Sequence, residues 1–212
     1  MATTTTTTTV TTEPRQAAGP SRIRPGTRAE IGRINALIAT VIGRTMGTTA
    51  PPRIFTTLSR HRRLYRCWLR FAGALMPGGT LPRADSELVI LRVAHNCDSQ
   101  YEWRHHERMG ETAGLSAAQV QAAASGSEEV FDERQLLLLR TADELHSGRD
   151  ISDELWAELG TEFSEVELIE LCMLVGHYEM LAMTLNALRV QPDEFRPGGP
   201  TVVAKLLGRL RS

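Results

Sequence analysis

The chain lacks the features of a disulfide-bonded, zinc-ribbon or membrane-spanning protein. Its three cysteines, Cys67, Cys97 and Cys172, are far apart in 212 residues and form no CxxC pair. This spacing argues against a disulfide framework and a zinc ribbon, and it fits a reducing cytoplasm. The sequence has no run of about eighteen apolar residues and no basic and apolar start typical of a signal peptide. We therefore expect a cytoplasmic protein with no membrane partner.

A charge excess and a strand pattern are also missing. The 24 Lys and Arg residues nearly balance the 25 Asp and Glu residues, which leaves a net charge of -1. Without an overall basic field, a nucleic-acid partner is not expected. No segment alternates apolar and polar residues between hairpin turns, so the sequence gives little support for a sheet. The predicted fold class is all-α.

Composition also suggests where the folded part begins and ends. Residues 1–27 are rich in Thr, Pro and Gly and nearly free of large apolar side chains, so they cannot offset the entropy of ordering. Prolines at 192, 197 and 200 punctuate the other end. We expect a disordered arm over 1–27, a helical domain over 28–192 and a C-terminal tail over 193–212.

Apolar residues at three- and four-residue steps predict the outer helices. A first helix starts near Ile31, and one of its faces is lined by Ile31, Ile34, Leu37, Ile38, Val41 and Ile42. A second is expected as one helix over 54–75, and its predicted buried side includes Leu58, Leu64, Trp68, Leu69 and Phe71. Ser116 can cap a short helix. Further helices are predicted over 132–146, 152–159 and 164–189.

Polar side chains are densest between positions 87 and 106, where two helices meet. Asp85 is a candidate N-cap for the apolar run 88–94, which would place Glu87 in a first turn. Asn96 marks a break, and the S-x-x-E pattern of Ser99 to Glu102 is typical of a capping box. A helix should therefore run from Ser99 to about position 113, and the short connection should fold the two helices into a hairpin.

Glu102 and His106 are four residues apart and would share a helix face, where a carboxylate can orient an imidazole. Glu87 could approach the same imidazole from the preceding helix, giving an acid-base site of two carboxylates and one histidine. Simpler structural roles remain open. Glu102 could serve only as the partner of the Ser99 cap, and His106 could be an ordinary helical residue. His105 points away from this face and is expected to be exposed.

The same stretch, LPRADSELVILRVAHNCDSQYEWRHHERMGETAGLS, resembles the carboxymuconolactone decarboxylase-like family of the alkylhydroperoxidase D-like superfamily. The likeness rests on an acidic residue opening one helix, then YEW-x-x-H, then a Gly-Leu-Ser break. It extends more weakly from about Pro52 to Val190. The resemblance implies an alkylhydroperoxidase D-like helical fold and self-association into trimers, hexamers or similar assemblies. It also implies that no metal or organic cofactor is needed.

Alkylhydroperoxidases of this superfamily carry a Glu, a Cys-x-x-Cys pair and a His at fixed spacing. Glu87 and His106 fall on the Glu and His positions, whereas Ser99 and Glu102 occupy the two cysteine positions. Because that peroxidase chemistry needs one thiolate to attack and a second to resolve, the missing pair argues against it. The chain is closer to the branch without the CxxC motif.

That branch implies decarboxylation of a small cyclic carboxylic acid or lactone, a step in the breakdown of aromatic acids. We expect His106 to return a proton to the substrate while Glu102 and Glu87 hold its charge and tautomer. The expected substrate-binding residues are Tyr101, Trp103, Ser99, Arg92 and Cys97, with Arg104 and Arg108 as other possible anchors for an acid. Two alternatives stay open, namely a thiol-dependent peroxidase that uses Cys97 and a non-catalytic helical oligomer.

Overall fold

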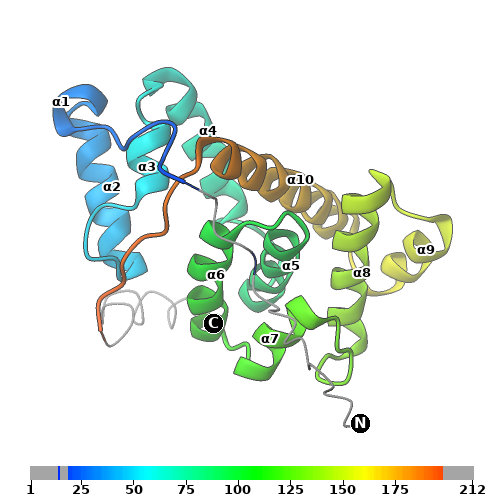
Figure 1. Ribbon diagram of the computed structural model, residues 1–212. Coiled ribbons are helices and arrows are strands. Elements are labelled where there is room, and N and C mark those ends of the chain that lie inside the picture. The colour runs from blue at the N-terminus through cyan, green and yellow to red at the C-terminus, as the bar shows by residue number, and fades with distance from the viewer. Residues whose placement is uncertain (1–13, 15–18, 198–212) are drawn as a thin grey trace, which may run out of the picture.

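The computed structural model describes Pro14 and residues 19–197, and ten helices build this part of the chain (Figure 1). Within it there is no strand, and one isolated bridge pairs Thr48 with Phe195. The all-α prediction is therefore confirmed. Most of the expected arm and tail lies outside the described residues. The helices are α1 (Arg28–Ile31), α2 (Arg33–Met46), α3 (Arg53–Leu58), α4 (Arg62–Leu75), α5 (Arg83–Asn96), α6 (Gln100–Ala113), α7 (Ala117–Ser125), α8 (Glu133–Gly148), α9 (Asp153–Glu162) and α10 (Glu165–Leu188).

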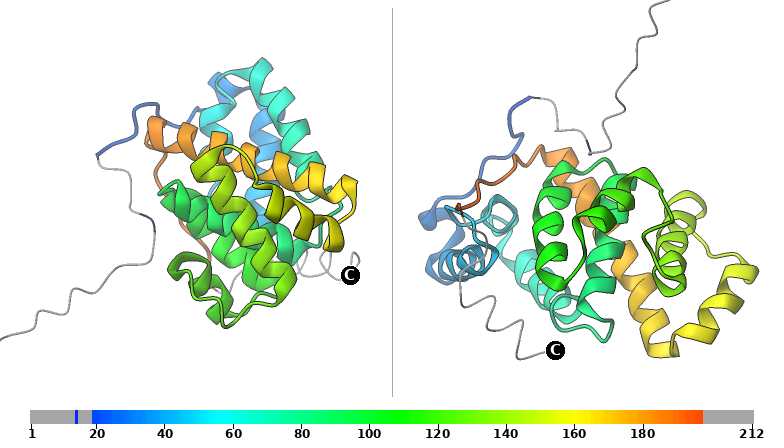
Figure 2. Two further views of the ribbon diagram at one scale, coloured as in Figure 1. Left: turned by 90° about the vertical axis from the view of Figure 1, so that its right-hand side faces the viewer. Right: turned by 90° about the horizontal axis from the view of Figure 1, so that it is seen from below.

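Helix α5 lies in the middle of the fold, and α6, α7, α8 and α10 pack around it (Figures 1 and 2). Its residues 88–91 are fully buried, because apolar side chains point in every direction around the helix. Two apolar clusters result. The larger one lies toward α8, α9 and α10, and the smaller one lies toward α6 and α7.

The predicted α5–α6 hairpin is present. Helix α5 ends at Asn96, Asp98 takes a positive φ of 49°, and α6 begins after the N-cap residue Ser99. Gly114, with φ 112°, ends α6 in the left-handed region that favours glycine. The N-cap prediction for α5 is wrong. The helix begins two residues before Asp85, whose carboxylate instead accepts a hydrogen bond from Arg134 at 2.9 Å.

The apolar face predicted for α2 is not the face that the fold buries. Ile34 and Leu37 are 76% and 64% exposed, whereas Asn35, Ala39 and Gly43 form the buried side. Small residues face inward here because the chain passes very close. A Cβ atom added at Gly43 would lie 2.9 Å from the ring of Pro52. An apolar periodicity therefore identified the helix but not which of its faces is covered.

The predicted single helix over 54–75 is divided in two. Helix α3 ends at Leu58, and His61 opens α4 by accepting a hydrogen bond from the Leu64 amide with its own side chain. On α4 the buried residues are Tyr65 and Leu75, while the expected core residues Leu64 and Phe71 are exposed. Arginines interleave the apolar residues of α4, so its apolar side is only partly covered.

Helix α10 is long and apolar enough, by length and composition alone, to cross a membrane. Half of its apolar window is buried within the fold, and Leu171, Leu174 and Leu185 belong to the larger core cluster. A buried core helix of a soluble protein has these properties. In Figure 1 the helix runs above α5, and it contacts both helices of the α5–α6 hairpin.

The segments on either side of the helical domain are bound to it. Arg22 donates its backbone N–H to the carbonyl of Leu188, and Gly26 donates to that of Thr56, so the described end of the expected arm lies against α10 and α3. Asp193, in the expected tail, is buried. Both ends of the domain therefore contribute contacts that composition did not predict.

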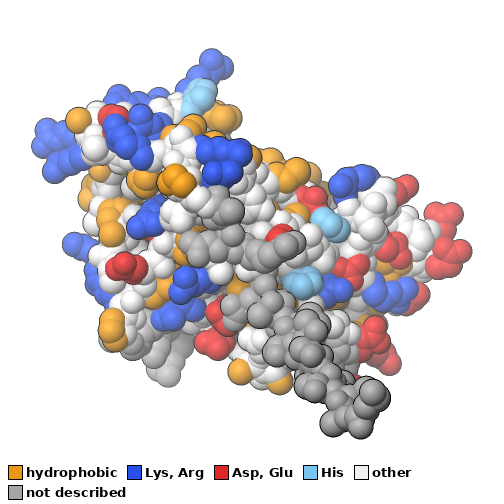
Figure 3. All heavy atoms as spheres, viewed as in Figure 1, with side chains coloured by type: hydrophobic (Ala, Val, Ile, Leu, Met, Phe, Trp, Pro, Cys, Tyr) orange, Lys and Arg blue, Asp and Glu red, His pale blue; other side chains and the backbone are white. Residues whose placement is uncertain are grey.

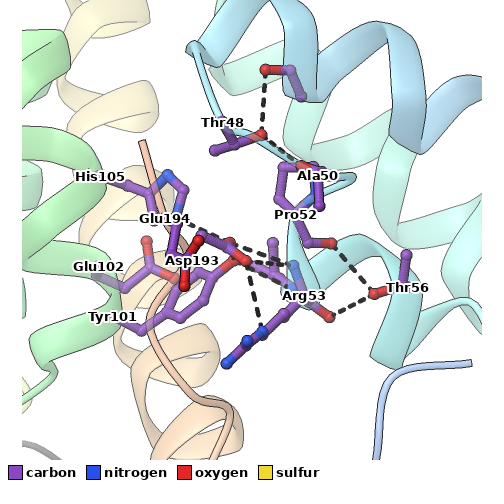
Figure 4. A network of polar contacts seen from close by, with 12 residues as sticks. Thr48, Ala50, Pro52, Arg53, Thr56, Tyr101, Glu102, His105, Asp193 and Glu194 are labelled. Carbon is purple, nitrogen blue, oxygen red and sulfur yellow. Dashed lines mark hydrogen bonds and ion pairs between the residues drawn. The ribbon is translucent and has the colours of Figure 1, made fainter. Parts of the chain in front are cut away.

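Asp193 joins α6 and α3 through one carboxylate (Figure 4). Tyr101 donates its hydroxyl hydrogen to it, and His105 Nε2 lies 3.1 Å from its Oδ2. The backbone N–H of Arg53 donates to both carboxylate oxygens, at 3.1 and 3.2 Å. Burial and the neighbouring Asp193 charge raise the pKa of Tyr101 well above its usual value, so this phenol remains a hydrogen-bond donor. The network fixes α6 against α3.

We expect Asp193→Ala to destabilise the protein by about 3 kcal/mol or more, because it leaves the buried partners of that carboxylate without an acceptor. Urea unfolding measures this loss. The matched control is Glu194→Ala, which removes an exposed carboxylate one residue away and should change the free energy of unfolding by less than about 0.5 kcal/mol. Equal effects of the two substitutions would show that the Asp193 network does not stabilise the fold.

Candidate active site

Glu87, Glu102 and His106 converge in the interior, as the sequence predicted. His106 Nδ1 lies 2.6 Å from Glu87 Oε2, and its Nε2 lies 3.3 Å from Glu102 Oε2. Each ring nitrogen thus has its own carboxylate partner. All three side chains are at least nine-tenths buried. The imidazole is held in one orientation by groups from both helices of the hairpin.

The capping-box interpretation of Glu102 is wrong. Ser99 is the N-cap residue of α6, but its side chain makes no cap hydrogen bond. The Glu102 carboxylate is instead directed one turn forward, to His106 on the same face of the helix. A second oxygen of Glu102 is buried and has no hydrogen-bond partner among the described residues. Such a buried free acceptor is costly unless a ligand or a moving proton uses it.

Arg83 extends the cluster toward the surface. It precedes Glu87 by one helical turn on α5, and its guanidinium lies 2.5 Å from Glu87 Oε1. The Arg83 side chain is 40% exposed while that of Glu87 is fully buried. The arginine therefore links the buried acid-base group to solvent, and it is the arginine that the structure places at the site.

Burial by itself would lower the pKa of His106, but the charge of Glu87 and the hydrogen bonds to both carboxylates outweigh it. The net effect raises the pKa of His106 to about 9. At neutral pH this histidine is therefore an imidazolium, with a proton on each nitrogen. A buried imidazolium between two carboxylates can act as a general acid, because loss of one proton leaves a neutral ring that hydrogen bonds still hold in place.

Tyr178 on α10 contacts His106, and an aromatic group continues from it through His177 to α4. Tyr178 meets the imidazole edge-on with ring centroids 5.1 Å apart, and His177 lies beside Tyr178 and against Trp68 and Phe71. Burial, helped by the positive charge of His106, lowers the pKa of His177. Its Nδ1 has no hydrogen-bond partner among the described residues. His177 thus contributes a neutral imidazole beside the charged one.

The structure does not bring the expected substrate-binding residues to this cluster. Trp103 is fully buried in the smaller core, and Tyr101 points to Asp193. Ser99 is the buried N-cap residue of α6, and its hydroxyl has no hydrogen-bond partner among the described residues. Arg92 forms a bidentate ion pair with Asp143 on α8, at 2.7 and 2.8 Å. These residues build the frame around the hairpin.

The remaining candidate residues, His105, Arg104, Arg108 and Cys97, also lie outside the His106 cluster. His105 is buried against Asp193, so the expectation that it is exposed is wrong. Arg104 is exposed, and Arg108 stacks over the ring of Phe195 at 4.5 Å. Cys97 lies beside His146 on α8, with Sγ 4.0 Å from Nδ1. Burial, together with Glu179, raises the pKa of the Cys97 thiol to about 12.

Sequence reasoning missed Arg83, His177 and Tyr178 as members of the site. The signal for Arg83 was readable, since an arginine four residues before Glu87 shares its helix face. For His177 and Tyr178 there was no comparable local signal. They reach the site only because α10 crosses the α5–α6 hairpin, a tertiary contact that no spacing rule gives.

Residues 62–142 match the model of the carboxymuconolactone decarboxylase family. The matched stretch includes both helices of the α5–α6 hairpin and therefore Glu87, Glu102 and His106. A comparison with curated protein sequences gives no significant match.

Solved structures with the same fold are known. An alkylhydroperoxidase AhpD core structure from Ralstonia eutropha, of an uncharacterized peroxidase-related protein, superposes with a TM-score of 0.73 at 16% identity, covering 91% of this chain and 98% of its own. A peroxidase-related protein from a Silicibacter species gives 0.69 at 14% identity, with 78% and 91% covered. The debrominase Bmp8, solved with 2,3,4-tribromopyrrole, gives 0.68 at 14% identity, with 89% and 96% covered.

At such identities these structures show the fold alone. The family match includes the α5–α6 hairpin with its Glu and His residues, and the structural similarity covers 91% of the chain. Residues 62–142 of the chain are therefore similar to the carboxymuconolactone decarboxylase family, the fold is that of the alkylhydroperoxidase D-like structures, and the sequence lacks the CxxC pair.

Proposed function

We propose that this protein is a cofactor-independent carboxy-lyase that acts on a small cyclic or unsaturated carboxylic acid, with His106 as the proton donor. The observation that supports this most directly is the buried imidazolium of His106, held by Glu87 on one nitrogen and Glu102 on the other. Decarboxylation needs such a group, because the carbon that loses CO2 must receive a proton.

In the proposed reaction, His106 is the only protein group that transfers a proton. The bond between the substrate carbon and its carboxylate breaks, CO2 leaves, and the electron pair moves into a conjugated carbonyl to give an enolate. His106 then donates one proton to that carbon and regains one from water. Nε2 is the better donor, since its 3.3 Å contact with Glu102 is looser than the 2.6 Å contact of Nδ1 with Glu87.

Arg83 is proposed to receive the substrate. It is the partly exposed cation next to Glu87, and a guanidinium suits a planar carboxylate. His177 and Phe71 would provide an aromatic wall beside the reacting carbon, and burial around Glu102 would limit water near the enolate. This arrangement favours a compact, flat, anionic substrate.

A thiol-dependent peroxidase is the less favoured function, although two structural neighbours are peroxidase-related. The CxxC pair is absent, and the Cys97 thiol is half-buried near the Glu179 carboxylate with its pKa raised to about 12. Peroxide attack requires a thiolate, so this environment opposes it.

Self-association remains a proposal and is supported by uncovered apolar side chains. Ile34 and Leu37 on α2, with Ile169 and Met183 on α10, are all more than half exposed. Exposed apolar groups of this kind are typical of subunit contacts. The unpaired cysteines are consistent with a location in the cytoplasm.

Replacing His106 with Asn should lower turnover by about 100-fold or more, because it removes the imidazolium that is proposed to return the proton. The assay measures CO2 release from carboxymuconolactone and a panel of related unsaturated and β-keto acids. Glu102→Gln should lower kcat with little change in KM, and Arg83→Gln should chiefly raise KM.

The matched control is Glu111→Gln, an exposed carboxylate on the same helix, which should leave both constants unchanged. Circular dichroism checks that each variant is folded. Undiminished turnover in His106→Asn contradicts the assignment of the proton donor, and a wild type that decarboxylates nothing in the panel contradicts the carboxy-lyase itself.

The pH dependence of kcat should follow the imidazolium form of His106. Since attraction to Glu87 and Glu102 raises its pKa to about 9, turnover should hold through neutral pH and fall as the pH rises through about 9. Glu87→Gln removes one of these charges and should move the falling limb to lower pH. A limb that stays in place in Glu87→Gln would mean that another group titrates.

A further inference from the structure

A second cluster of chemically reactive side chains lies at the C-terminal end of α5. Cys97, His146 and Glu179 present Sγ, Nδ1 and a carboxylate oxygen that all lie within 4.8 Å of one another. The Sγ to Nδ1 distance is 4.0 Å, and the Nδ1 to Glu179 Oε1 distance is 2.5 Å. Three different donor atoms thus point at one small space.

Three elements contribute one donor each, and they are packed together. Cys97 follows the last residue of α5, His146 lies in the last turn of α8, and Glu179 lies in the middle of α10 (Figure 1). Asn186 on α10 donates to the backbone carbonyl of Cys97 at 2.9 Å, which fixes the position of the thiol. The donors therefore come from elements whose relative positions are set by contacts outside the cluster.

The connection between α8 and α5 is also fixed just beside the cluster. Asp143, one turn before His146, is bound by both Arg92 and Asn96 from α5. These contacts hold the last turns of the two helices at a constant separation. Donors on rigid elements are a requirement for a metal site of defined geometry.

The same contacts do not form a nucleophile with a general base. In such a dyad the base uses one ring nitrogen for the thiol and the other for the orienting carboxylate. Here the thiol and the carboxylate both face Nδ1 of His146. They compete for a single nitrogen, which is the arrangement expected of ligands around a common centre.

We propose that Cys97, His146 and Glu179 form a binding site for a divalent transition-metal ion, of which Zn²⁺ fits the donor set best. Thiolate, imidazole and carboxylate are the three ligand types that Zn²⁺ accepts, at about 2.3, 2.0 and 2.1 Å. Ligands at those lengths in a tetrahedron lie roughly 3.3 to 3.6 Å apart. The present separations of 2.5 and 4.0 Å bracket that range.

Metal binding therefore requires only local side-chain movement. The distance between His146 Nδ1 and Glu179 Oε1 increases by about 1 Å, and Cys97 Sγ moves inward by roughly half an ångström. The metal replaces the thiol proton, which passes to solvent. The side chain of His146 is 34% exposed and that of Glu179 is 13% exposed, so an ion can enter from solvent. Acidic side chains, with arginines between them, lie over α8 and α9 on this side of the molecule (Figure 3).

Three protein ligands leave one tetrahedral position for water. The ion would join the ends of α5 and α8 to α10 and so hold the turn that leads into α6, away from the His106 cluster. Its expected role is to stabilise the hairpin. This site departs from the family resemblance, which implies no metal, and it is independent of the proposed carboxy-lyase activity.

The test uses the full chain stripped of metal and then titrated with Zn²⁺ and with Co²⁺. Equilibrium dialysis should give one Zn²⁺ per chain, and Zn²⁺ should raise the melting temperature. Co²⁺ should produce the near-ultraviolet charge-transfer band of a thiolate ligand. Cys97→Ser should abolish that band and weaken Zn²⁺ binding by at least about 100-fold, and His146→Gln should weaken it comparably.

Cys172→Ser is the matched control, because Cys172 lies half-buried on α10 outside the donor group, and it should retain the band and the affinity. His61→Gln controls for binding by an accessible histidine. Absence of stoichiometric Zn²⁺ in the wild type overturns the proposal. So does a Cys97→Ser variant, shown to be folded by circular dichroism, that binds Zn²⁺ as tightly as the wild type.

Discussion

The structure depends on how the charge of Glu87 is neutralised inside the protein. Helix α5 is buried on every side, and a carboxylate on such a helix loses its hydration, which costs several kcal/mol unless cations and hydrogen bonds replace the water. His106 and Arg83 supply those partners at 2.6 and 2.5 Å. Because His106 comes from α6, this pairing specifies how the two helices of the hairpin lie against each other. Apolar contacts alone specify the rotation of α5 about its axis weakly, because its apolar side chains face every direction. The pairing of Glu87 with His106 selects one rotation.

The same interaction gives the site its chemistry. An imidazole between two carboxylates keeps its proton at neutral pH, and burial ensures that this proton is not lost to bulk water. Structures with the same fold are described as peroxidase-related proteins and as a debrominase. The fold therefore provides a rigid helical hairpin, and the residues placed on it decide the reaction. In this chain Ser99 and Glu102 occupy the positions of the dithiol found in alkylhydroperoxidases, which argues against thiol exchange.

Much of the hairpin could be predicted from sequence because its signals are local. The break at Asn96, the start after Ser99 and the stop at Gly114 follow from chain chemistry, and four-residue spacing placed Glu102 beside His106. Tertiary contacts decided the rest. Asp193 turned Tyr101 and His105 into structural residues, and α10 delivered His177 to the site. Periodicity located α2, but its apolar residues Ile34 and Leu37 are exposed. The buried side carries the small residues Ala39 and Gly43 instead, because Pro52 comes very close to Gly43.

The charge state of His106 is the centre of this account, and nitrogen-15 NMR of the imidazole measures it directly. In the wild type at pH 7.5, we predict that both ring nitrogens of His106 carry a proton, with chemical shifts characteristic of an imidazolium. A spectrum that shows a neutral tautomer, with one protonated and one bare nitrogen, would contradict the account, since the buried cluster would then lack both the cation that balances Glu87 and Glu102 and the proton that the reaction requires.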